Sequence, residues 1–477
     1  MILRQGSIKK NLIYQMIYQI LVFFIPLVIS PYLTRTLGGQ ALGVYSYSNA
    51  FAYYFVVLAM LGITRYGQRA ISVVKNNEVE LRKTFWSLYI VHFAISCVAV
   101  LLYFIFVAIY NPSEKIIYII QGIYVASSIF DVTWLFYGLE NFKSVVIKNF
   151  LVKIMELIFI FCFVKNPSDL WVYTLIISIS IMLGQLMLIP TAVKNIVPIR
   201  FKAQDTLVHI KPLLTLWISV IASTLYTVFD RTLIGAMTET VNVAFYEYAD
   251  KIVRVPIAVL GAISTVTYPR MCALVANDKG EESQKVFIKS FIITTFLSSG
   301  AVSLIISIAK DFSILYYGQE FELSGMLMIF LSPIIMIISI GDIVRTQILI
   351  PHKMDKQFSF CITINAIVNL ILSGVLIPII GVYGAVIGTV AAEICGLILN
   401  TLYSKEHIKV EKILKIIGIY LAITMITTIT VYIVRTFVII QSLFFSVVFN
   451  AVIVSLCYVS LSIISYFYFI KKYDFFK

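Results

Sequence analysis

Charge is scarce in this sequence. Asp, Glu, Lys and Arg make up 13% of its 477 residues, whereas soluble globular domains carry roughly 25%. Hydrophobic residues account for 60%, and the mean hydropathy is +0.96. So few charges exclude an ordinary soluble fold and indicate a chain that crosses a membrane many times.

Cysteine and histidine, which form disulfides and bind metals, are also scarce. The six cysteines stand singly in or beside apolar segments, without a CxxC pair, and are typical of small buried hydrophobes. The four histidines are isolated and form no HExxH motif. We therefore expect no disulfide framework, no metal site and no cofactor.

Motifs of nucleotide-driven or covalent chemistry are missing as well. The sequence contains neither GxxxxGK[ST], which cradles phosphates, nor GxSxG, which carries a nucleophilic serine. The connections between apolar segments are too short to hold a soluble catalytic domain. We expect a protein that is not an enzyme, and an intramembrane enzyme ranks last among the alternatives.

Apolar segments of about 20 residues, the length that spans ~30 Å of hydrocarbon, recur along the chain. They predict an all-α polytopic membrane protein with about 14 transmembrane helices. Prolines interrupt several segments, including Pro26 and Pro31 in the first and Pro333 in the tenth. Proline removes a backbone hydrogen bond and bends a helix, which suits a moving element.

Basic residues are unevenly distributed between the connections. The net charge is +13, and most Lys and Arg fall in one set of loops and tails. This asymmetry follows the positive-inside rule and predicts that both termini are cytoplasmic. The basicity therefore indicates topology, and we expect no nucleic-acid partner.

Two parts of the sequence resemble each other. RTL at 35–37 followed by VYSYS at 44–48 is echoed by RTL at 231–233 followed by FYEYA at 245–249, with about five extra residues between the landmarks. We interpret the chain as two related six-helix halves with two appended spans. The expected division is an N-lobe at 1–192, a cytoplasmic linker at 193–211, a C-lobe at 212–403, and two appended helices with a cytoplasmic tail at 404–477.

Ionisable residues inside the predicted spans are the main functional signal, because each costs roughly 2.5 to 3.5 kcal/mol if it faces lipid. Glu247, Asp250, Lys251 and Arg254 share one helical face, since they lie at i, i+3, i+4 and i+7. We expect this face to line a water-filled passage. The alternative is that the four residues pair with one another. The other members of this set are Asp131, Lys153, Glu156, Asp230, Arg231, Asp342 and Glu393, while Lys148 is expected to face a loop.

Several segments resemble the polysaccharide transporter family of the multidrug/oligosaccharidyl-lipid/polysaccharide flippase superfamily. They are PYLTRTLGGQALGVYSYSNA at 31–50, DVTWLFYGLENF at 131–142, FDRTLIG at 229–235, LYYGQEF at 315–321 and NLILSGVLIPIIGVYGAVIGT at 369–389. The resemblance implies a V-shaped pair of six-helix lobes around a central cavity, with alternating access. It also implies a bacterial inner-membrane protein that flips undecaprenyl-diphosphate-linked oligosaccharide repeat units to the outer leaflet for O-antigen, lipopolysaccharide or capsule assembly. Its expected partners are this substrate, membrane lipids, the polymerase and other polysaccharide-assembly proteins.

With such a substrate, the in-span cations become candidate diphosphate ligands, because guanidinium and ammonium groups match phosphate oxygens. We assign this role to the in-span residues Lys153, Arg231, Lys251 and Arg254, and to Arg35 next to an external loop, with an interfacial anchor as the alternative for Arg35. Three of them, Arg35, Lys153 and Arg231, have fewer local partners in the sequence.

Polar stripes and carboxylates complete the candidate site. The residues expected to bind sugar hydroxyls, or alternatively to bond neighbouring helices, are Gln15, Gln19, Asn49, Ser223 and Thr227. The carboxylates that could couple transport to a cation, or alternatively form paired core groups, are Asp131, Glu156, Asp230, Glu247, Asp250 and Glu393.

The runner-up function is a cation-coupled multidrug exporter of the same superfamily. Such exporters resemble one another in carrying a carboxylate in the first helix, whereas the first acidic residue here is Glu78. A peptidoglycan-precursor flippase and a teichoic-type polymer flippase follow as further alternatives.

Overall fold

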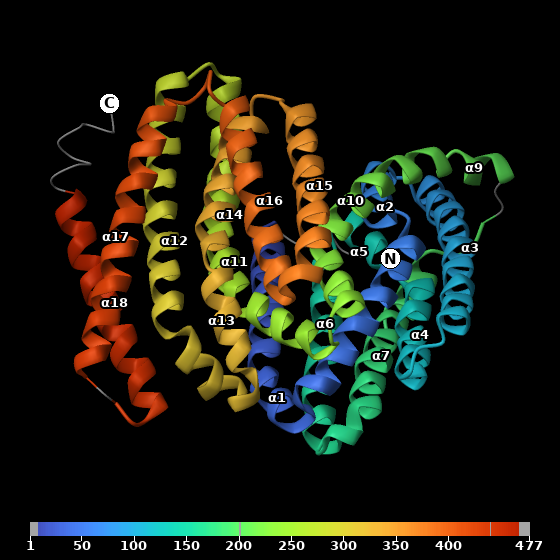
Figure 1. Ribbon diagram of the computed structural model, residues 1–477. Helices are drawn as coiled ribbons and strands as arrows, with labels where there is room; N and C mark the ends of the chain where they lie inside the picture. The colour runs from blue at the N-terminus through green and yellow to red at the C-terminus, as the bar shows by residue number, and fades with distance from the viewer. Residues whose placement is uncertain (1–7, 200–201, 439, 467–477) are drawn as a thin grey trace. The chain divides into compact units, whose positions relative to one another are not determined.

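The computed structural model describes residues 8–199, 202–438 and 440–466, with side chains from residue 25 onward except at 195, 203, 218–219, 222–223 and 225–227. Every described element is a helix, which confirms the predicted all-α fold (Figure 1). The chain divides into two compact units, residues 1–232 and 233–477. The predicted boundaries at 192, 211 and 403 stay a prediction.

Unit 1 contains α1 (Ile8–Met60), α2 (Ile63–Val74), α3 (Glu78–Tyr110), α4 (Lys115–Ser127), α5 (Thr133–Gly138), α6 (Phe142–Phe163), α7 (Leu170–Leu186), α8 (Ile189–Asn195), α9 (Ala203–Leu207) and most of α10 (Ile210–Met237), with 3-10 turns at Ser128–Phe130 and Pro167–Asp169. Unit 2 contains α11 (Val241–Ala276), α12 (Gly280–Tyr317), α13 (Glu322–Leu331), α14 (Pro333–Val344), α15 (Asp355–Ile380), α16 (Val382–Tyr403), α17 (Val410–Phe437) and α18 (Leu443–Ser465), with a 3-10 turn at Gln319–Phe321 and a π-helical turn at Arg345–Leu349.

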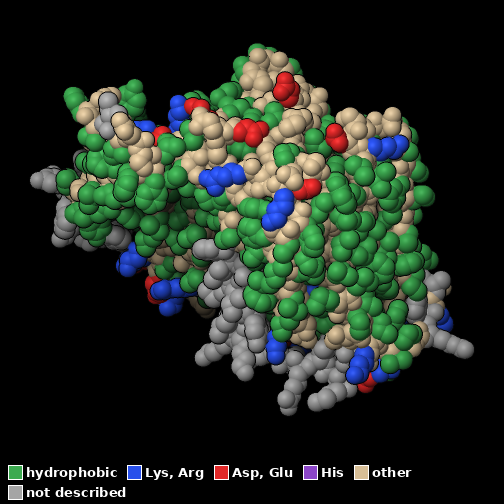
Figure 2. Space-filling model, turned by 90° about the horizontal axis from the view of Figure 1, so that it is seen from below, with side chains coloured by type: hydrophobic (Ala, Val, Ile, Leu, Met, Phe, Trp, Pro, Cys, Tyr) green, Lys and Arg blue, Asp and Glu red, His purple; other side chains and the backbone are tan. Residues whose placement is uncertain are grey.

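The helices are long and apolar enough to cross a membrane repeatedly. Ten of the described helical segments meet this condition, or eleven if the bent pair α13 and α14 forms one span. The chain is therefore a multi-pass membrane protein, and the count of 14 stays a prediction. Apolar side chains also cover broad areas of the surface, while charged ones are few and scattered over the face in view (Figure 2).

The first two predicted spans form one element, α1. Its backbone remains helical through Pro26 and Pro31 and loses helical geometry at Gly38, where φ is 77° and ψ is 172°. This left-handed region of φ favours glycine, which has no Cβ to clash with the backbone. In the second copy of the repeat, α10 ends at Met237 and α11 begins at Val241. The extra residues of that copy thus fall where one helix ends and the next begins.

Two of the predicted spans are interrupted helices. The tenth bends by 42° between Leu331 and Pro333, because proline cannot donate the backbone bond that a continuous helix requires. The fourth ends as an α-helix at Ser127 and restarts at Thr133. Between them, Asp131 Oδ1 accepts hydrogen bonds from the backbone N–H and the hydroxyl of Thr133, so this carboxylate helps to start α5.

The core of unit 1 forms where the amphipathic helix α2 packs on α5 and α3. Trp134 is fully buried and stacks on Phe85 at a centroid distance of 5.4 Å. A Cβ added at Gly67 of α2 would lie 2.6 Å from the Trp134 ring, and one added at Gly138 of α5 would lie 2.6 Å from Ile71. These two glycines let α2 and α5 approach closely.

The connection between α7 and α10 docks on the same region of unit 1. His209 places Nδ1 2.9 Å from the Tyr66 hydroxyl and Nε2 3.1 Å from the Ser87 hydroxyl. Burial lowers the pKa of His209, although the charge of Asp205 opposes this shift. The pKa of Asp205 is itself lowered by the Lys202 backbone N–H and by its ion pair with Lys83.

In unit 2, α17 and α18 lie beside α12 (Figure 1). Hydrogen bonds join these helices at Ser299 of α12: its hydroxyl meets the Tyr458 hydroxyl at 2.6 Å, and Thr424 donates to its carbonyl at 3.4 Å. Hydrogen bonds between helices replace the hydrophobic effect that lipid does not supply. The two helices after residue 404 are therefore fastened to unit 2.

Glycines let α15 and α16 of unit 2 pack closely against each other. A Cβ at Gly384 of α16 would lie 2.4 Å from the backbone of Leu376 and Ile377, and one at Gly388 would lie 2.2 Å from Ser373 Oγ. Only glycine permits α15 and α16 to approach this closely.

Candidate functional site

The charged face at the centre of the sequence lies on α11. Lys251 Nζ is 2.8 Å from Glu247 Oε1, and Arg254 Nε is 2.6 Å from Asp250 Oδ2. Each pair joins residues four apart with the acid first, which is the favourable order on a helix. The pairing predicted as an alternative to ligand contact is therefore confirmed, and lining of a passage stays a prediction.

On this face of α11 the acidic side chains are more deeply buried than the basic ones. The side chains of Glu247 and Asp250 are 9% and 8% exposed, whereas those of Lys251 and Arg254 are 33% and 42% exposed. Lys251 Nζ also lies 4.1 Å from the centre of the Tyr248 ring, in a cation–π contact. An approaching ligand would therefore meet the cationic ends first, with the carboxylates beneath them.

Unit 1 repeats this arrangement on α6. Lys153 Nζ lies 2.6 Å from Glu156 Oε2, and the two side chains are 35% and 2% exposed. The interpretation that Lys153 has few local partners is wrong, because the i,i+3 spacing brings the carboxylate to it on the same face. A buried acid beneath a half-exposed base thus occurs in both units.

Two of these buried carboxylates are only half satisfied. Glu156 Oε1 and Asp250 Oδ1 have no hydrogen-bond partner among the described residues. Buried polar atoms are normally paired, so an orphan oxygen marks a place for a proton or an added donor. Each carboxylate fixes its cation through one oxygen and leaves the other available.

A second polar cluster in unit 1 surrounds Asp131. Its Oδ2 accepts from Gln185 Nε2 at 3.1 Å, and Gln185 Oε1 accepts from Lys148 Nζ at 3.3 Å. Lys148 is 7% exposed, so its expected loop position is wrong: the side chain points into the packing of α6 and α7. The sequence analysis also missed His92, fully buried nearby, whose Nε2 lies 2.7 Å from the Ser128 carbonyl.

Asp230 and Arg231 lie near the end of α10. Asp230 is buried and Arg231 is half-buried, and both lie close enough to Tyr54 of α1 to act on it electrostatically. The Tyr54 hydroxyl meets Thr232 Oγ1 at 2.9 Å. Arg35 is exposed on α1, three residues before Gly38.

Among the remaining predicted polar residues, Asn49 bonds to a neighbouring helix. Asn49 Nδ2 donates to Gln121 Oε1 of α4 at 3.3 Å, which is the helix-bonding alternative. Glu393 is half-buried on α16. The side chains of Gln15, Gln19, Ser223 and Thr227 lie outside the described residues. Asp342, also within a predicted span, pairs with Arg345 at 3.3 Å.

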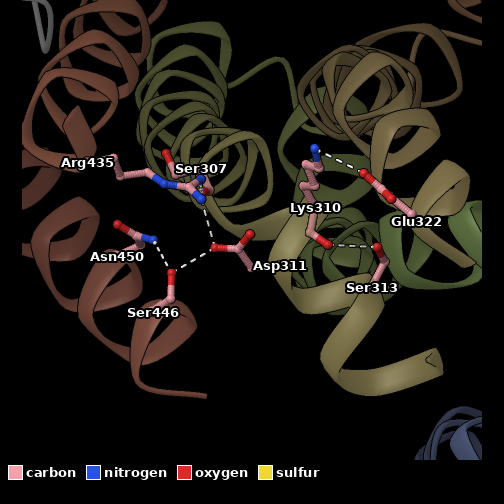
Figure 3. A network of polar contacts seen from close by, with 8 residues as sticks. All are labelled: Ser307, Lys310, Asp311, Ser313, Glu322, Arg435, Ser446 and Asn450. Carbon is pink, nitrogen blue, oxygen red and sulfur yellow. Dashed lines mark hydrogen bonds and ion pairs between the residues drawn. The ribbon is translucent and has the colours of Figure 1, made fainter. Parts of the chain in front are cut away.

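The structure adds a network that the sequence analysis missed (Figure 3). Asp311 of α12 accepts from Arg435 Nη2 of α17 at 2.8 Å and from Ser446 Oγ of α18 at 2.7 Å. The neighbouring Lys310 pairs with Glu322 of α13 at 3.0 Å. The apolar pattern predicts spans at about 286–309 and 413–434, which end just before Asp311 and Arg435. The helical pattern that continues to Tyr317 and Phe437 was the available signal.

No group of three or more His, Cys, Asp or Glu side chains is arranged for a metal ion within the described part of the chain. The charged clusters described above consist of ion pairs and hydrogen bonds. Such groups can hold an anion or exchange a proton.

The chain is similar to known proteins over most of its length. Two proteins, each named "Putative O-antigen transporter", are similar to 81% of this chain. The protein from Shigella dysenteriae is 26% identical, and the match covers 97% of that protein. The protein from Escherichia coli (strain K12) is 22% identical, and the match covers 94% of that protein. The fold is similar to "Lipid II flippase MurJ, inward closed conformation", with a TM-score of 0.74, 16% identity, and coverage of 96% of this chain and 98% of that one.

A second solved structure, an inward-facing multidrug resistance MATE family transporter of the MOP superfamily, has a TM-score of 0.62 and 12% identity over 85% of this chain and 98% of that one. Below 25% identity these structures establish the fold alone. The model of the family described as "Polysaccharide biosynthesis protein" matches residues 8–275, and the chain belongs to this family.

Proposed function

We propose that this protein is a flippase for undecaprenyl-diphosphate-linked oligosaccharide repeat units. It would move them from the cytoplasmic to the outer leaflet of the bacterial inner membrane, by alternating access, for O-antigen or capsule assembly. The observation that carries the proposal is the repeated pair of a buried acid and a half-exposed base: Lys153 with Glu156, Lys251 with Glu247, and Arg254 with Asp250. Membership of the polysaccharide biosynthesis protein family supports it.

These pairs suit the binding and release of a diphosphate. A lone cation inside a membrane protein is costly, and a buried carboxylate below it keeps it charged and in place. Arg254 binds Asp250 through Nε, and the planar fork of a guanidinium matches the geometry of phosphate oxygens. Because each acid competes with the phosphate for the cation, the diphosphate is held without being trapped.

The other candidates have supporting roles in the proposal. Arg35 and Arg231 add cationic groups for the diphosphate. Sugar hydroxyls bind the polar stripes that include Gln15, Gln19, Asn49, Ser223 and Thr227. The polyprenyl tail stays in lipid.

Energy for export has two sources in this proposal. An inside-negative potential favours outward movement of negative phosphates by about 2.3 kcal/mol per charge per 100 mV. Carboxylates that gain or lose a proton or bind a cation can supply the rest. Glu156 and Asp250 are the first candidates because each has an orphan oxygen. The others are Asp131, Asp230, Glu247 and Glu393.

We propose cytoplasmic termini and a partnership with the polymerase that consumes the flipped repeat units. The function is tested by deleting the gene and analysing lipid-linked intermediates on each side of the membrane. We expect undecaprenyl-linked repeat units to accumulate on the cytoplasmic face, and surface polymer to be lost. Unchanged intermediates with increased drug sensitivity would instead establish the multidrug exporter. Accumulation of a peptidoglycan or teichoic precursor would establish those substrates.

A further inference from the structure

A shallow cleft lies between the start of α12 and the start of α17, at the upper end of unit 2 in Figure 1. Its enclosed volume is about 10 Å³, roughly the space that one water needs. The cleft therefore cannot enclose a compact soluble ligand, but a flexible apolar chain can lie across it. Six of the residues that line it are apolar: Phe287, Ile288, Phe291, Ile408, Ile413 and Ile416.

The cleft lies where two candidate membrane spans begin. Both α12 and α17 are long and apolar enough to cross a membrane. The residues at 277–285 and 404–409, by contrast, are rich in charged side chains. Charged residues at the ends of spans lie at the level of the lipid headgroups. The cleft is therefore at the depth where headgroups meet acyl chains.

Two lysines of this cleft have no partner of their own. Lys409 is exposed and Lys412 is half-buried, and no ion pair or side-chain hydrogen bond joins either of them to another described residue. The stretch 405–415 contains four lysines and two glutamates, so its net charge is positive. Helix α17 also starts without a side-chain cap, and an uncapped N-terminus carries a positive partial charge. This end of the cleft therefore favours an anion.

His407 holds the connection before α17 in place. Its ring stacks on that of His352 at a centroid distance of 3.8 Å, and His352 Nδ1 donates to the Ile348 carbonyl at 2.8 Å. Burial and the neighbouring His352 lower the pKa of His407, although Glu406 opposes this shift. The His407 imidazole is therefore mostly neutral near pH 7, and the positive charge at the cleft comes from the lysines.

We propose that this cleft binds an anionic phospholipid with a phosphodiester headgroup, such as phosphatidylglycerol. The phosphate oxygens accept hydrogen bonds from the ammonium groups of Lys409 and Lys412, and an acyl chain lies across Ile288 and the other apolar residues. In a zwitterionic lipid the phosphate is already balanced by the lipid's own ammonium, so such a lipid binds more weakly. The site shares no residue with the charged pairs of α6 and α11, and its test does not depend on the proposed function.

The test is native mass spectrometry of the delipidated full-length protein in detergent, titrated in turn with dioleoyl phosphatidylglycerol and dioleoyl phosphatidylcholine. We expect phosphatidylglycerol to bind about 25-fold more tightly, or about fivefold for each lysine, the factor that corresponds to ~1 kcal/mol per lysine beside anionic lipid. Lys409→Gln/Lys412→Gln should remove this preference. Ile288→Ser should weaken both lipids about fourfold, the factor that corresponds to the contact of one CH₂ group, ~0.8 kcal/mol.

The matched control is Lys405→Gln/Lys415→Gln. This variant removes the same charge from the same stretch, but Lys405 and Lys415 are exposed and do not line the cleft. It should keep the full preference for phosphatidylglycerol.

A photoreactive phosphatidylglycerol, with a diazirine in its acyl chain, locates the site. We expect labelled peptides from 284–291 and 408–416 in the wild type. Labelling of these peptides should be strongly reduced in Lys409→Gln/Lys412→Gln and should persist in the control variant.

Three results would overturn the proposal. They are an equal affinity of the wild-type protein for the two lipids, an equal loss of preference in the two double-lysine variants, and labelling that is confined to other spans. Soluble sn-glycerol 3-phosphate distinguishes the lipid from a free phosphate ester. If it competes at concentrations near the lipid's own, the site recognises the free ester and the proposal fails; weak competition supports the membrane lipid.

Discussion

The pair of Asp250 and Arg254 gives the sharpest test of the charged face on α11. The acid is 8% exposed and the base 42% exposed, and they share a single 2.6 Å bond. Loss of either partner should therefore have very different consequences. Arg254→Gln leaves a carboxylate buried without its ion-pair partner, whereas Asp250→Asn leaves a guanidinium that is 42% exposed.

The expected magnitudes follow from this difference in burial. Breaking a buried pair by removing one partner costs about 3 to 5 kcal/mol, and the lower end applies here because the arginine is partly exposed. Asp250→Asn should cost about 1 kcal/mol, as for an exposed pair. The double variant Asp250→Asn/Arg254→Gln should recover most of the stability, since no buried charge remains unpaired.

The assay has two measurements on the same variants. Thermal unfolding of the purified protein in detergent should rank Arg254→Gln lowest, with the double variant close to Asp250→Asn. Complementation of the deletion strain, read as surface polymer at matched protein level, should show loss of transport in the double variant. As a control, Lys279→Gln breaks an exposed pair with Glu282 and should change neither measurement.

Equal unfolding temperatures for Arg254→Gln and Asp250→Asn would refute the claim that the acid is the buried partner. Full transport by the stable double variant would refute the role of Arg254 as a phosphate ligand. The two results are independent, so either part of the reasoning can fail alone.

Two further predictions concern unit 1. Gly67→Val should destabilise the protein by about 1 to 3 kcal/mol through overpacking against Trp134, measured by thermal unfolding. The control is Gly261→Val, where a Cβ meets nothing within 4 Å. Equal effects of the two substitutions would contradict the packing argument. Because burial lowers the pKa of His209, its docking with Tyr66 and Ser87 is favoured while the imidazole is neutral and should weaken as the pH falls below about 6.5, the ordinary value. The rate of protease cleavage between α7 and α10 should rise from pH 7.5 to 5.5 in the wild type and stay constant in His209→Gln. A constant rate in the wild type would contradict the role of His209 in docking.

The sequence pattern alone predicted those features that depend on neighbouring residues of a single helix. Spacing of four residues placed Lys251 beside Glu247 and Arg254 beside Asp250, because a helix brings i and i+4 together wherever it lies. The same rule, applied to Lys153 and Glu156, would have corrected the expectation that Lys153 lacks a partner. Apolar length likewise established the all-α membrane fold, since the hydrocarbon core allows few alternatives.

The tertiary structure decided which atoms of these groups are accessible and which distant residues meet. No spacing in the sequence shows that Glu247 and Asp250 are buried while their bases are half-exposed, because burial depends on the helices packed against α11. The cluster of Asp131, Gln185 and Lys148 joins residues far apart in the chain, as does the network of Asp311, Arg435 and Ser446. Periodicity reports one helix at a time, whereas a hydrogen bond between helices exists only after the chain has packed.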